Sequence, residues 1–114
     1  MSLKGLERLS LPPRVAGALR DFVESIRRVC GDARVYLFGS YARGTWVEDS
    51  DVDLVVVSRC FEGMEPGERY RFVRGLASRE LAFEFLVYTP EEFEEALKRS
   101  VVVQDAMEYA VELS

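Results

Sequence analysis

The stretch FGSYARGTWVEDSDVDLVVV, residues 38–57, contains the features that decide the fold. It joins an apolar segment, predicted as a strand over 33–38, to a valine-rich run, predicted as a strand over 51–58. A continuous apolar run of this length is typical of a strand buried on both faces. Asp51 and Asp53 stand two residues apart where this second strand begins, so we expect both carboxylates on one face, roughly 6–7 Å apart.

The rest of the chain predicts helices around these strands. Apolar residues at spacings of three and four indicate a helix of about 18 residues between Ser10, its expected N-cap, and Gly31. Thr89-Pro-Glu-Glu is a capping box that begins another helix. This order predicts one domain over residues 1–114, of the α/β or α+β class, with helices packed on a small mixed β-sheet. The remaining expected elements are a short helical turn after Ser40, a strand over 81–88, and helices over 68–79, 90–99 and 101–113.

Composition excludes several classes of protein. The longest aliphatic run, Leu54–Val57, is too short to cross a membrane, and the N-terminal residues lack the apolar core of a signal peptide, so we expect a cytoplasmic protein without membrane association. The net charge of −5 argues against stand-alone binding to nucleic acid, although a nucleotide whose charge is carried by metal ions remains compatible with it.

Histidine is absent and cysteine is scarce. The lack of histidine removes Ser-His-Asp and Cys-His catalysis and most zinc sites, so acid–base work falls to other side chains. Cys30 and Cys60 fit no metal-binding spacing, which leaves two buried thiols, the favoured interpretation, or a disulfide. Asn is absent, Gln104 is the only glutamine and charged residues are abundant, a usage that favours a thermophilic source.

Three carboxylates indicate a site for metal-assisted chemistry. Two aspartates as close as Asp51 and Asp53 repel each other, so an arginine, a hydrogen-bond network or a cation must compensate, and a hard cation such as Mg²⁺ takes oxygen ligands of this kind. Glu84 lies in the apolar strand LAFEFLV, where an isolated acid has no structural use, so we expect it to join them. Gly39-Ser40 follows the preceding strand, where free backbone N–H groups and a hydroxyl favour phosphate binding. Taken singly, each acid also has a plain structural explanation, as a turn residue or an arginine partner.

These residues together resemble the signature of the DNA polymerase β-like nucleotidyltransferase superfamily, and in particular its minimal nucleotidyltransferase domains. The signature is Gly-Ser, ten residues, Asp-x-Asp and a third acid on a later strand, here Gly39-Ser40, Asp51-Val52-Asp53 and Glu84. The resemblance covers residues 35–93 and implies the polymerase β palm-like fold. Glu84 departs from the pattern, because the family usually has Asp at that position.

The resemblance implies a role for each of these positions. Asp51, Asp53 and Glu84 would be catalytic and would bind Mg²⁺, as two ions, while Gly39 and Ser40 would hold the phosphates of ATP or another NTP. Arg43 matches an arginine that often follows the Gly-Ser turn, and it either contacts phosphate or pairs with an acid. Trp46 either stacks on a base or a partner, or folds back onto the domain.

The resemblance also implies an acceptor on a partner. Larger members of this superfamily carry an added helical domain that binds the acceptor. Minimal members are commonly paired with a HEPN-domain ribonuclease that acts as a toxin. In such pairs the nucleotidyltransferase is the antitoxin and adds AMP to a tyrosine of the toxin. We therefore expect Mg²⁺-dependent transfer of a nucleoside monophosphate, AMP in the first instance, to a hydroxyl of a partner protein. A HEPN protein, a second copy of this chain, or both are the expected partners. The alternatives are an inactive subunit that neutralises its partner by contact, and an enzyme for small alcohols such as aminoglycosides.

Overall fold

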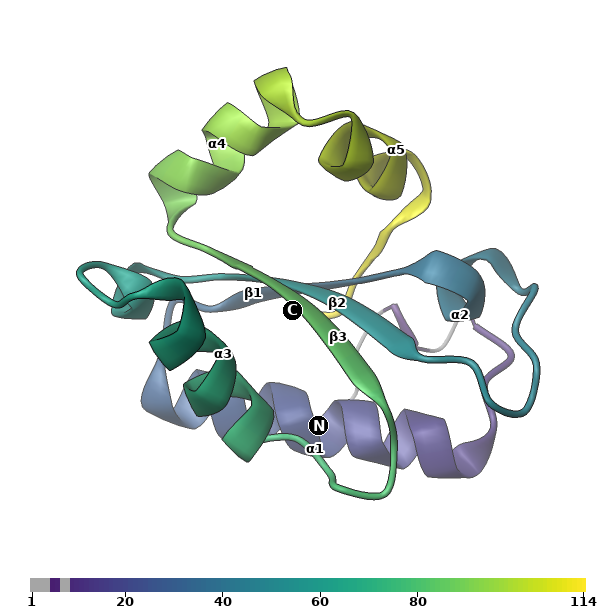
Figure 1. Ribbon diagram of the computed structural model, residues 1–114. Coiled ribbons are helices and arrows are strands. Elements are labelled where there is room, and N and C mark those ends of the chain that lie inside the picture. The colour runs from purple at the N-terminus through teal and green to yellow at the C-terminus, as the bar shows by residue number, and fades with distance from the viewer. Residues whose placement is uncertain (1–4, 7–8) are drawn as a thin grey trace.

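The structure, a computed structural model, describes residues 5–6 and 9–114, and Figure 1 shows a single sheet between two layers of helices. The helices are α1 (Pro13–Val29), α2 (Gly39–Arg43), α3 (Pro66–Gly75), α4 (Pro90–Arg99) and α5 (Val101–Tyr109), with the 3₁₀ helix η2 (Arg59–Phe61). The strands are β1 (Arg34–Phe38), β2 (Val52–Val57), β3 (Phe83–Tyr88) and β4 (Val111–Glu112).

Strand β2 lies inside a sheet whose order is β3-β2-β1-β4. It pairs antiparallel with β1 and parallel with β3, so the sheet is mixed, as the sequence predicts. Every residue of β2 is buried except Asp53, which is partly exposed. The valine-rich run is therefore covered on both faces, and one polar residue interrupts it.

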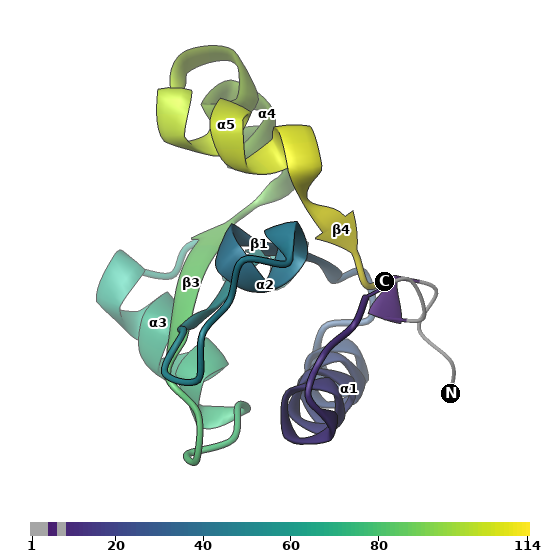
Figure 2. The same cartoon turned by 90° about the vertical axis from the view of Figure 1, so that its right-hand side faces the viewer.

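Helices α1 and α3 cover one face of the sheet (Figures 1 and 2). The apolar stripe of α1 includes Leu19, Phe22 and Ile26, which are completely buried against strand residues such as Leu37 and Leu54. Burying side chains of this size stabilises the fold by about 1.5–3 kcal/mol each. Most of the core therefore lies on the face away from the side chain of Asp53.

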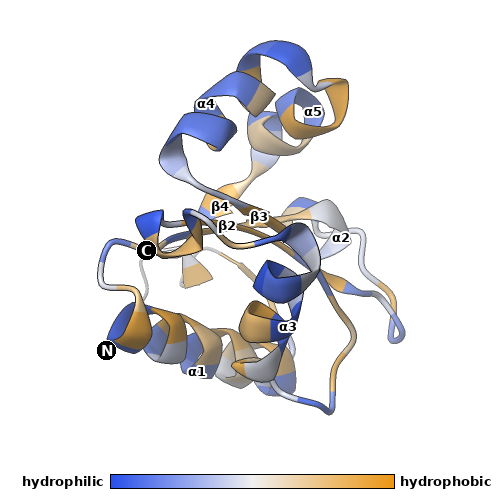
Figure 3. Cartoon of the chain, turned by 60° about the vertical axis from the view of Figure 1, so that its left-hand side comes forward, coloured by the Kyte–Doolittle hydropathy of each residue, from blue (hydrophilic) through white to orange (hydrophobic). Residues whose placement is uncertain are grey.

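Helices α4 and α5 cover the opposite face. A smaller buried cluster lies there, made of Val55 and Val57 of β2, Phe93 of α4 and Val103 of α5. Figure 3 shows that α4 is mostly hydrophilic, in contrast to the strands beneath it. The α4–α5 layer thus contacts the sheet through few apolar side chains.

Arg69 connects α3, β3 and α4. Its guanidinium donates to both carboxylate oxygens of Glu92, to the carbonyl of Met64 at 3.0 Å and to the carbonyl of Val87 at 3.5 Å. This partner lowers the pKa of Glu92. Glu92 also completes the predicted capping box: it accepts from the Thr89 N–H, and its own N–H donates to the Thr89 hydroxyl.

The structure corrects the expected ends of several elements. Ser10 is not the N-cap of α1, because Pro12 holds that position and no side chain caps the helix. The helix expected over 101–113 stops at Tyr109, and Val111–Glu112 form β4 beside β1. Helix α3 begins before the expected range of 68–79, because Pro66 starts it and Glu65 and Glu68 form a capping box. It also ends earlier, at Gly75.

The favoured interpretation of the cysteines is wrong. Cys30 and Cys60 form a disulfide, with their Cα atoms 5.8 Å apart, and Cys60 is exposed. The bond links the end of α1 to η2. Next to it, Asp32 accepts hydrogen bonds from the Ser58 hydroxyl at 2.6 Å and from the Arg59 N–H at 2.9 Å. The pairing depends on the turn after α1, which a spacing of 30 residues does not reveal.

None of the helices within residues 5–6 and 9–114 combines the length and the apolar character needed to cross a bilayer.

We expect reduction of the disulfide to lower the free energy of unfolding. A closed loop of 30 residues restricts the unfolded chain, and that restriction contributes about 3.6 kcal/mol. Urea unfolding of the oxidised protein, with and without a thiol reductant, measures the loss. The Cys60→Ser variant is the control: its free energy of unfolding should equal that of the reduced protein and should not change when the reductant is added. Equal midpoints for oxidised and reduced protein would contradict the expectation.

Candidate active site

The three predicted acids lie at one end of β2 and β3, on the face covered by α4 and α5. Asp53 pairs in register with Glu84 of the parallel neighbour β3, so their side chains project side by side. Asp51 immediately precedes β2 and is exposed. Val52 and Leu54 point the other way, into the main core, as strand alternation predicts.

Asp51, Asp53 and Glu84 form an acid cluster in which the surroundings of Asp53 disfavour its ionisation. Burial raises the pKa of Asp53 to about 6, and the negative charges of Asp51 and Glu84 contribute to the rise. Three ion pairs occur within the described part of the chain, and none of them includes a member of this cluster. Structural pairing with arginine, the plain explanation for Asp53 and Glu84, therefore does not account for these two acids. The arrangement concentrates negative charge where a cation would relieve it.

Gly39 packs directly against the carboxylate of Asp53. Its φ of +75° lies in the left-handed region, and a Cβ atom built on it would overlap Oδ2 of Asp53. A side chain at this position would therefore strain the backbone and displace the Asp53 carboxylate. The glycine of the Gly-Ser turn thus allows the backbone at the start of α2 to approach the acid cluster.

Ser40 is the second residue of α2, at the end of the helix nearest Asp53. No side chain caps this end: Phe38 occupies the N-cap position and provides no hydrogen bond. The first N–H groups of a helix have no partner within it, so they stay available to an external acceptor. Their position beside the acids is compatible with the phosphate-binding role expected of Gly39 and Ser40.

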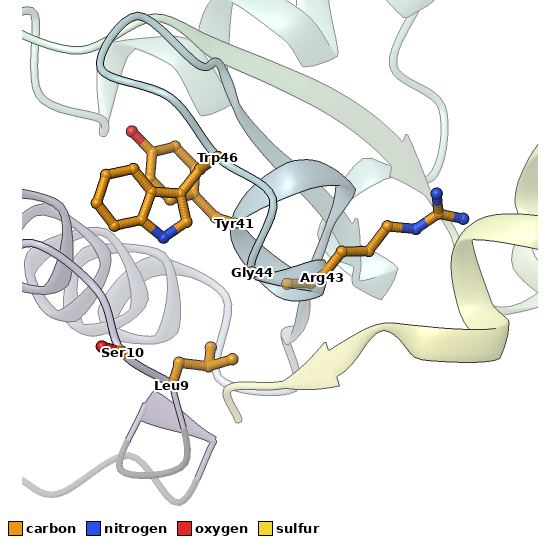
Figure 4. A pocket seen from close by; sticks show the side chains of 7 residues that line it. Leu9, Ser10, Tyr41, Arg43, Gly44 and Trp46 are labelled. Atoms are coloured by element: carbon orange, nitrogen blue, oxygen red, sulfur yellow. The ribbon is translucent and has the colours of Figure 1, made fainter.

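Arg43 extends toward α5 (Figure 4). Its guanidinium lies 4.0 Å from the centre of the Tyr109 ring and pairs with Asp105 at 3.7 Å. Of the two roles left open for Arg43, the structure shows pairing with an acid. Sequence reasoning missed Asp105 and Tyr109, because the contact joins helices more than 60 residues apart and no local pattern signals it.

Trp46 folds back onto the domain. Its ring stacks on Tyr41 at 5.6 Å and packs against the main core. With Leu9, Ser10 and Gly44 it lines a pocket of about 470 Å³ (Figure 4). None of the three acids lines this pocket, which lies beside the C-terminal end of α2 and its C-cap, Gly44. We therefore place the candidate site at the acids and not in this pocket.

The cluster fits a cation by its chemistry, since carboxylate oxygens are the ligands that Mg²⁺ prefers. Within residues 5–6 and 9–114, however, no three or more His, Cys, Asp or Glu side chains are arranged to hold a metal ion among themselves. Mg²⁺ commonly uses one or two carboxylates and takes its other ligands from water and substrate phosphates. A site completed by a nucleotide agrees with both observations.

A comparison with known families identifies the fold and its chemistry. The family described as "Nucleotidyltransferase domain" matches residues 18–112, which include α2, all three acids and both helical layers. The chain belongs to this nucleotidyltransferase family. It is accordingly an enzyme that transfers a nucleotidyl group, and the resemblance and the mixed α/β fold expected from the sequence are confirmed.

Individual relatives of this nucleotidyltransferase include archaeal proteins. It is 28% identical over 97 residues to a Methanocaldococcus jannaschii protein named "Putative protein adenylyltransferase MJ0141", covering 83% of this chain and 94% of that protein. A second protein of that organism, "Putative protein adenylyltransferase MJ1305", is 49% identical over 43 residues, covering 36% of this chain and 29% of the other.

Solved structures share the fold. A "putative nucleotidyltransferase" from Sulfolobus solfataricus superimposes with a TM-score of 0.60 and 24% identity, over 72% of this chain and 73% of that one. Another, described by the same words, gives a TM-score of 0.53 and 25% identity, over 72% and 89% of the two chains.

Replacing Gly39 by alanine should disturb the acid cluster beyond the cost of its backbone conformation. Gly44→Ala is the matched control, because Gly44 has a φ of +79° but open space around its Cα. Both variants lose about 1 kcal/mol to backbone strain. Gly39→Ala should lose about 2 kcal/mol more, since the new methyl group must displace the Asp53 carboxylate. Urea unfolding measures both variants, and equal losses would contradict the close approach.

Asp53→Asn should stabilise the ligand-free protein above pH 6. The pKa of Asp53 is raised in the folded state, from 3.8 to about 6, so wild-type stability declines as pH rises through this interval. The variant lacks that decline and should be more stable than wild type by about 1 kcal/mol at pH 8, after allowance for solvent screening of a half-buried carboxylate.

Thermal unfolding from pH 4 to pH 8 tests this expectation. Glu94→Gln, which changes an exposed acid on α4, is the control and should follow wild type throughout. An Asp53→Asn curve parallel to wild type would contradict the raised pKa of Asp53.

Proposed function

We propose that this nucleotidyltransferase is an Mg²⁺-dependent protein adenylyltransferase that transfers AMP from ATP to a hydroxyl of a partner protein. The observation that carries the proposal is the acid cluster of Asp51, Asp53 and Glu84, which has no basic partner among the described ion pairs and lies against Gly39. The names of the two Methanocaldococcus relatives support protein as the acceptor class and AMP as the transferred group.

Each residue of the cluster has a separate role in this proposal. Asp51 and Asp53 would hold Mg²⁺, and Gly39 and Ser40 would bind the nucleotide's terminal phosphates through backbone N–H groups and the serine hydroxyl. When bound, the metal supplies positive charge that stabilises the attacking and leaving oxygens. Glu84, paired in register with Asp53, would orient the acceptor hydroxyl and accept its proton.

The transfer balances as a single displacement at phosphorus. The acceptor oxygen forms a bond to the α-phosphorus of ATP while the bond from that phosphorus to the bridging oxygen breaks. Pyrophosphate leaves with the bond's electron pair, and the hydroxyl proton passes to Glu84 and then to water. The products are the AMP-modified protein and pyrophosphate.

Labelled ATP tests the proposed activity. With ATP labelled at the α-phosphate, Mg²⁺ and an extract of the source cells, label should appear on protein. Asp53→Asn should reduce the rate at least 100-fold, and Glu84→Gln by about 10²–10⁴-fold, the usual contribution of general-base catalysis. Glu84→Asp should recover part of the rate, and Glu94→Gln should match wild type. Undiminished labelling by Asp53→Asn would contradict the proposal, and label confined to small molecules would assign the enzyme to small alcohols instead.

The proposal extends to an antitoxin role beside a HEPN-domain ribonuclease. Its support is the resemblance of the Gly39 to Glu84 signature to minimal nucleotidyltransferases that act in such pairs. Co-expression with a candidate ribonuclease separates catalysis from neutralisation by contact. If transfer is required, wild type should restore growth and Asp53→Asn should not. Rescue by Asp53→Asn would favour the non-catalytic alternative.

A further inference from the structure

Within residues 5–6 and 9–114, no strand pairs with the outer edge of strand β3. Strand β3 is the terminal strand in the order β3-β2-β1-β4, and Figure 1 shows it outermost, between α3 and α4. Its other edge pairs with β2: the Val52 N–H donates to the carbonyl of Ala82, and the Ser58 N–H donates to that of Tyr88. Because alternate residues of a parallel ladder face the partner, the backbone groups of residues 83, 85 and 87 point outward.

Part of this edge is already occupied and part is not. The carbonyl of Val87 faces outward as expected and accepts a hydrogen bond from Arg69. Beside it lies a groove of about 410 Å³ between α3 and β3, lined by Pro66, Tyr70 and Leu86 among others. Tyr70 is 43% exposed although its ring meets Phe85 at 6.2 Å. An extended chain would thus find both outward backbone groups and a groove of apolar and aromatic side chains, which the Arg69–Glu92 ion pair also lines.

The register across the sheet connects this edge to the acid cluster. Phe38, Asp53 and Glu84 occupy one row on strands β1, β2 and β3. The next position in the row lies beyond β3, where an added strand would run. A side chain at that position, on the α4–α5 face, would be the direct neighbour of the Glu84 carboxylate.

We propose that the acceptor protein docks as an extended strand, antiparallel to β3, with its hydroxyl-bearing residue opposite Glu84; this inference rests on the proposed function. The backbone of Glu84 faces β2, so its antiparallel partner forms a non-hydrogen-bonded pair, in which Cα atoms lie about 4.5 Å apart and side chains are closest. The residues before and after the acceptor then exchange hydrogen bonds with Phe85 and Phe83. The hydroxyl arrives next to the carboxylate that would take its proton.

The groove and the charges indicate what the docked segment contains. The residue two positions before the acceptor lies opposite Leu86, on the α4–α5 face, and the residue immediately before it lies opposite Phe85, near Tyr70. Both positions favour apolar side chains, because their neighbours are apolar or aromatic. The neighbouring acids Asp53 and Glu84 and the net charge of −5 favour basic residues at the ends of the segment.

N-methylated peptides test the docking mode. The probes are nonapeptides with a central Tyr, Ser or Thr, lysine at both ends and apolar residues between. One set carries N-methyl groups on the two residues that flank the centre, whose N–H groups would bond to Phe85 and Phe83. The matched set carries them two positions from the centre, where the N–H groups would point to solvent. Transfer of labelled AMP is measured as kcat/KM with wild-type enzyme.

We expect methylation of the flanking residues to lower kcat/KM about 30-fold, as the loss of two hydrogen bonds predicts, and the matched set to keep activity within about threefold. Tyr70→Ala should raise the KM for unmethylated peptide and leave kcat unchanged. Val102→Ala, which removes an exposed valine on α5, should change neither. Equal sensitivity of the two methylated sets, or an unchanged KM for Tyr70→Ala, overturns the docking mode.

The remaining outcomes distinguish the docking mode from the proposed function. Label on folded proteins but on no peptide overturns docking through an extended segment and leaves the proposed function standing. Label on neither protein nor peptide contradicts the proposed function itself. A ligand-free dimer with the amides of Phe85 and Val87 protected from hydrogen exchange assigns the edge to a second copy, and it too overturns the proposal.

Discussion

Phe38 of β1 pairs with Asp53 of β2, and this antiparallel register places Gly39 against the Asp53 carboxylate. Because β2 is buried on both faces, the register is strongly specified: a slip of one residue would turn Asp53 into the main core beneath α1. The same strand fixes Glu84 through its parallel pairing with β3. The buried β2 strand thus fixes the register that places the three acids on one face of the sheet.

The cluster opposes the stability of the ligand-free fold. Burial and neighbouring charges make ionisation of Asp53 unfavourable, and the described ion pairs place no basic side chain against it. The opposite face compensates, because Leu19, Phe22, Ile26 and their neighbours are fully buried there. A fold that concentrates its apolar contacts on one face can tolerate electrostatic repulsion on the other, where a functional site needs it.

Local sequence predicted those features that depend on short-range patterns. The α1 stripe, the three longer strands and the Thr89 capping box follow from periodicity and capping chemistry, and the grouping of Asp51, Asp53 and Glu84 follows from strand alternation. Features set by distant contacts were not predicted. Strand β4 exists because Leu37 and Tyr36 offer partners to a segment that reads locally as helix.

The partners of Arg43 and the pairing of the cysteines were not predicted, for the same reason. Arg43 meets Asp105 and Tyr109 only because α5 folds back toward α2, and Cys60 meets Cys30 only because η2 lies at the end of α1. Neither spacing carries a periodic signal. By contrast, the close approach of Gly39 to Asp53 explains in atomic terms why the turn of the signature begins with glycine.

Because α4 and α5 pack sparsely on the sheet, the two sides of the sheet should differ in their resistance to local unfolding. The four-residue buried cluster beneath these helices is far smaller than the core around α1, so this layer should open locally at a lower free energy than global unfolding requires. The acids lie on the face that this layer covers, and the aromatic contact of Arg43 with Tyr109 is one of the few links that tie α5 to α2. Transient opening would thus expose Asp53, the one partly buried acid of the three, while the α1 side of the sheet stays intact.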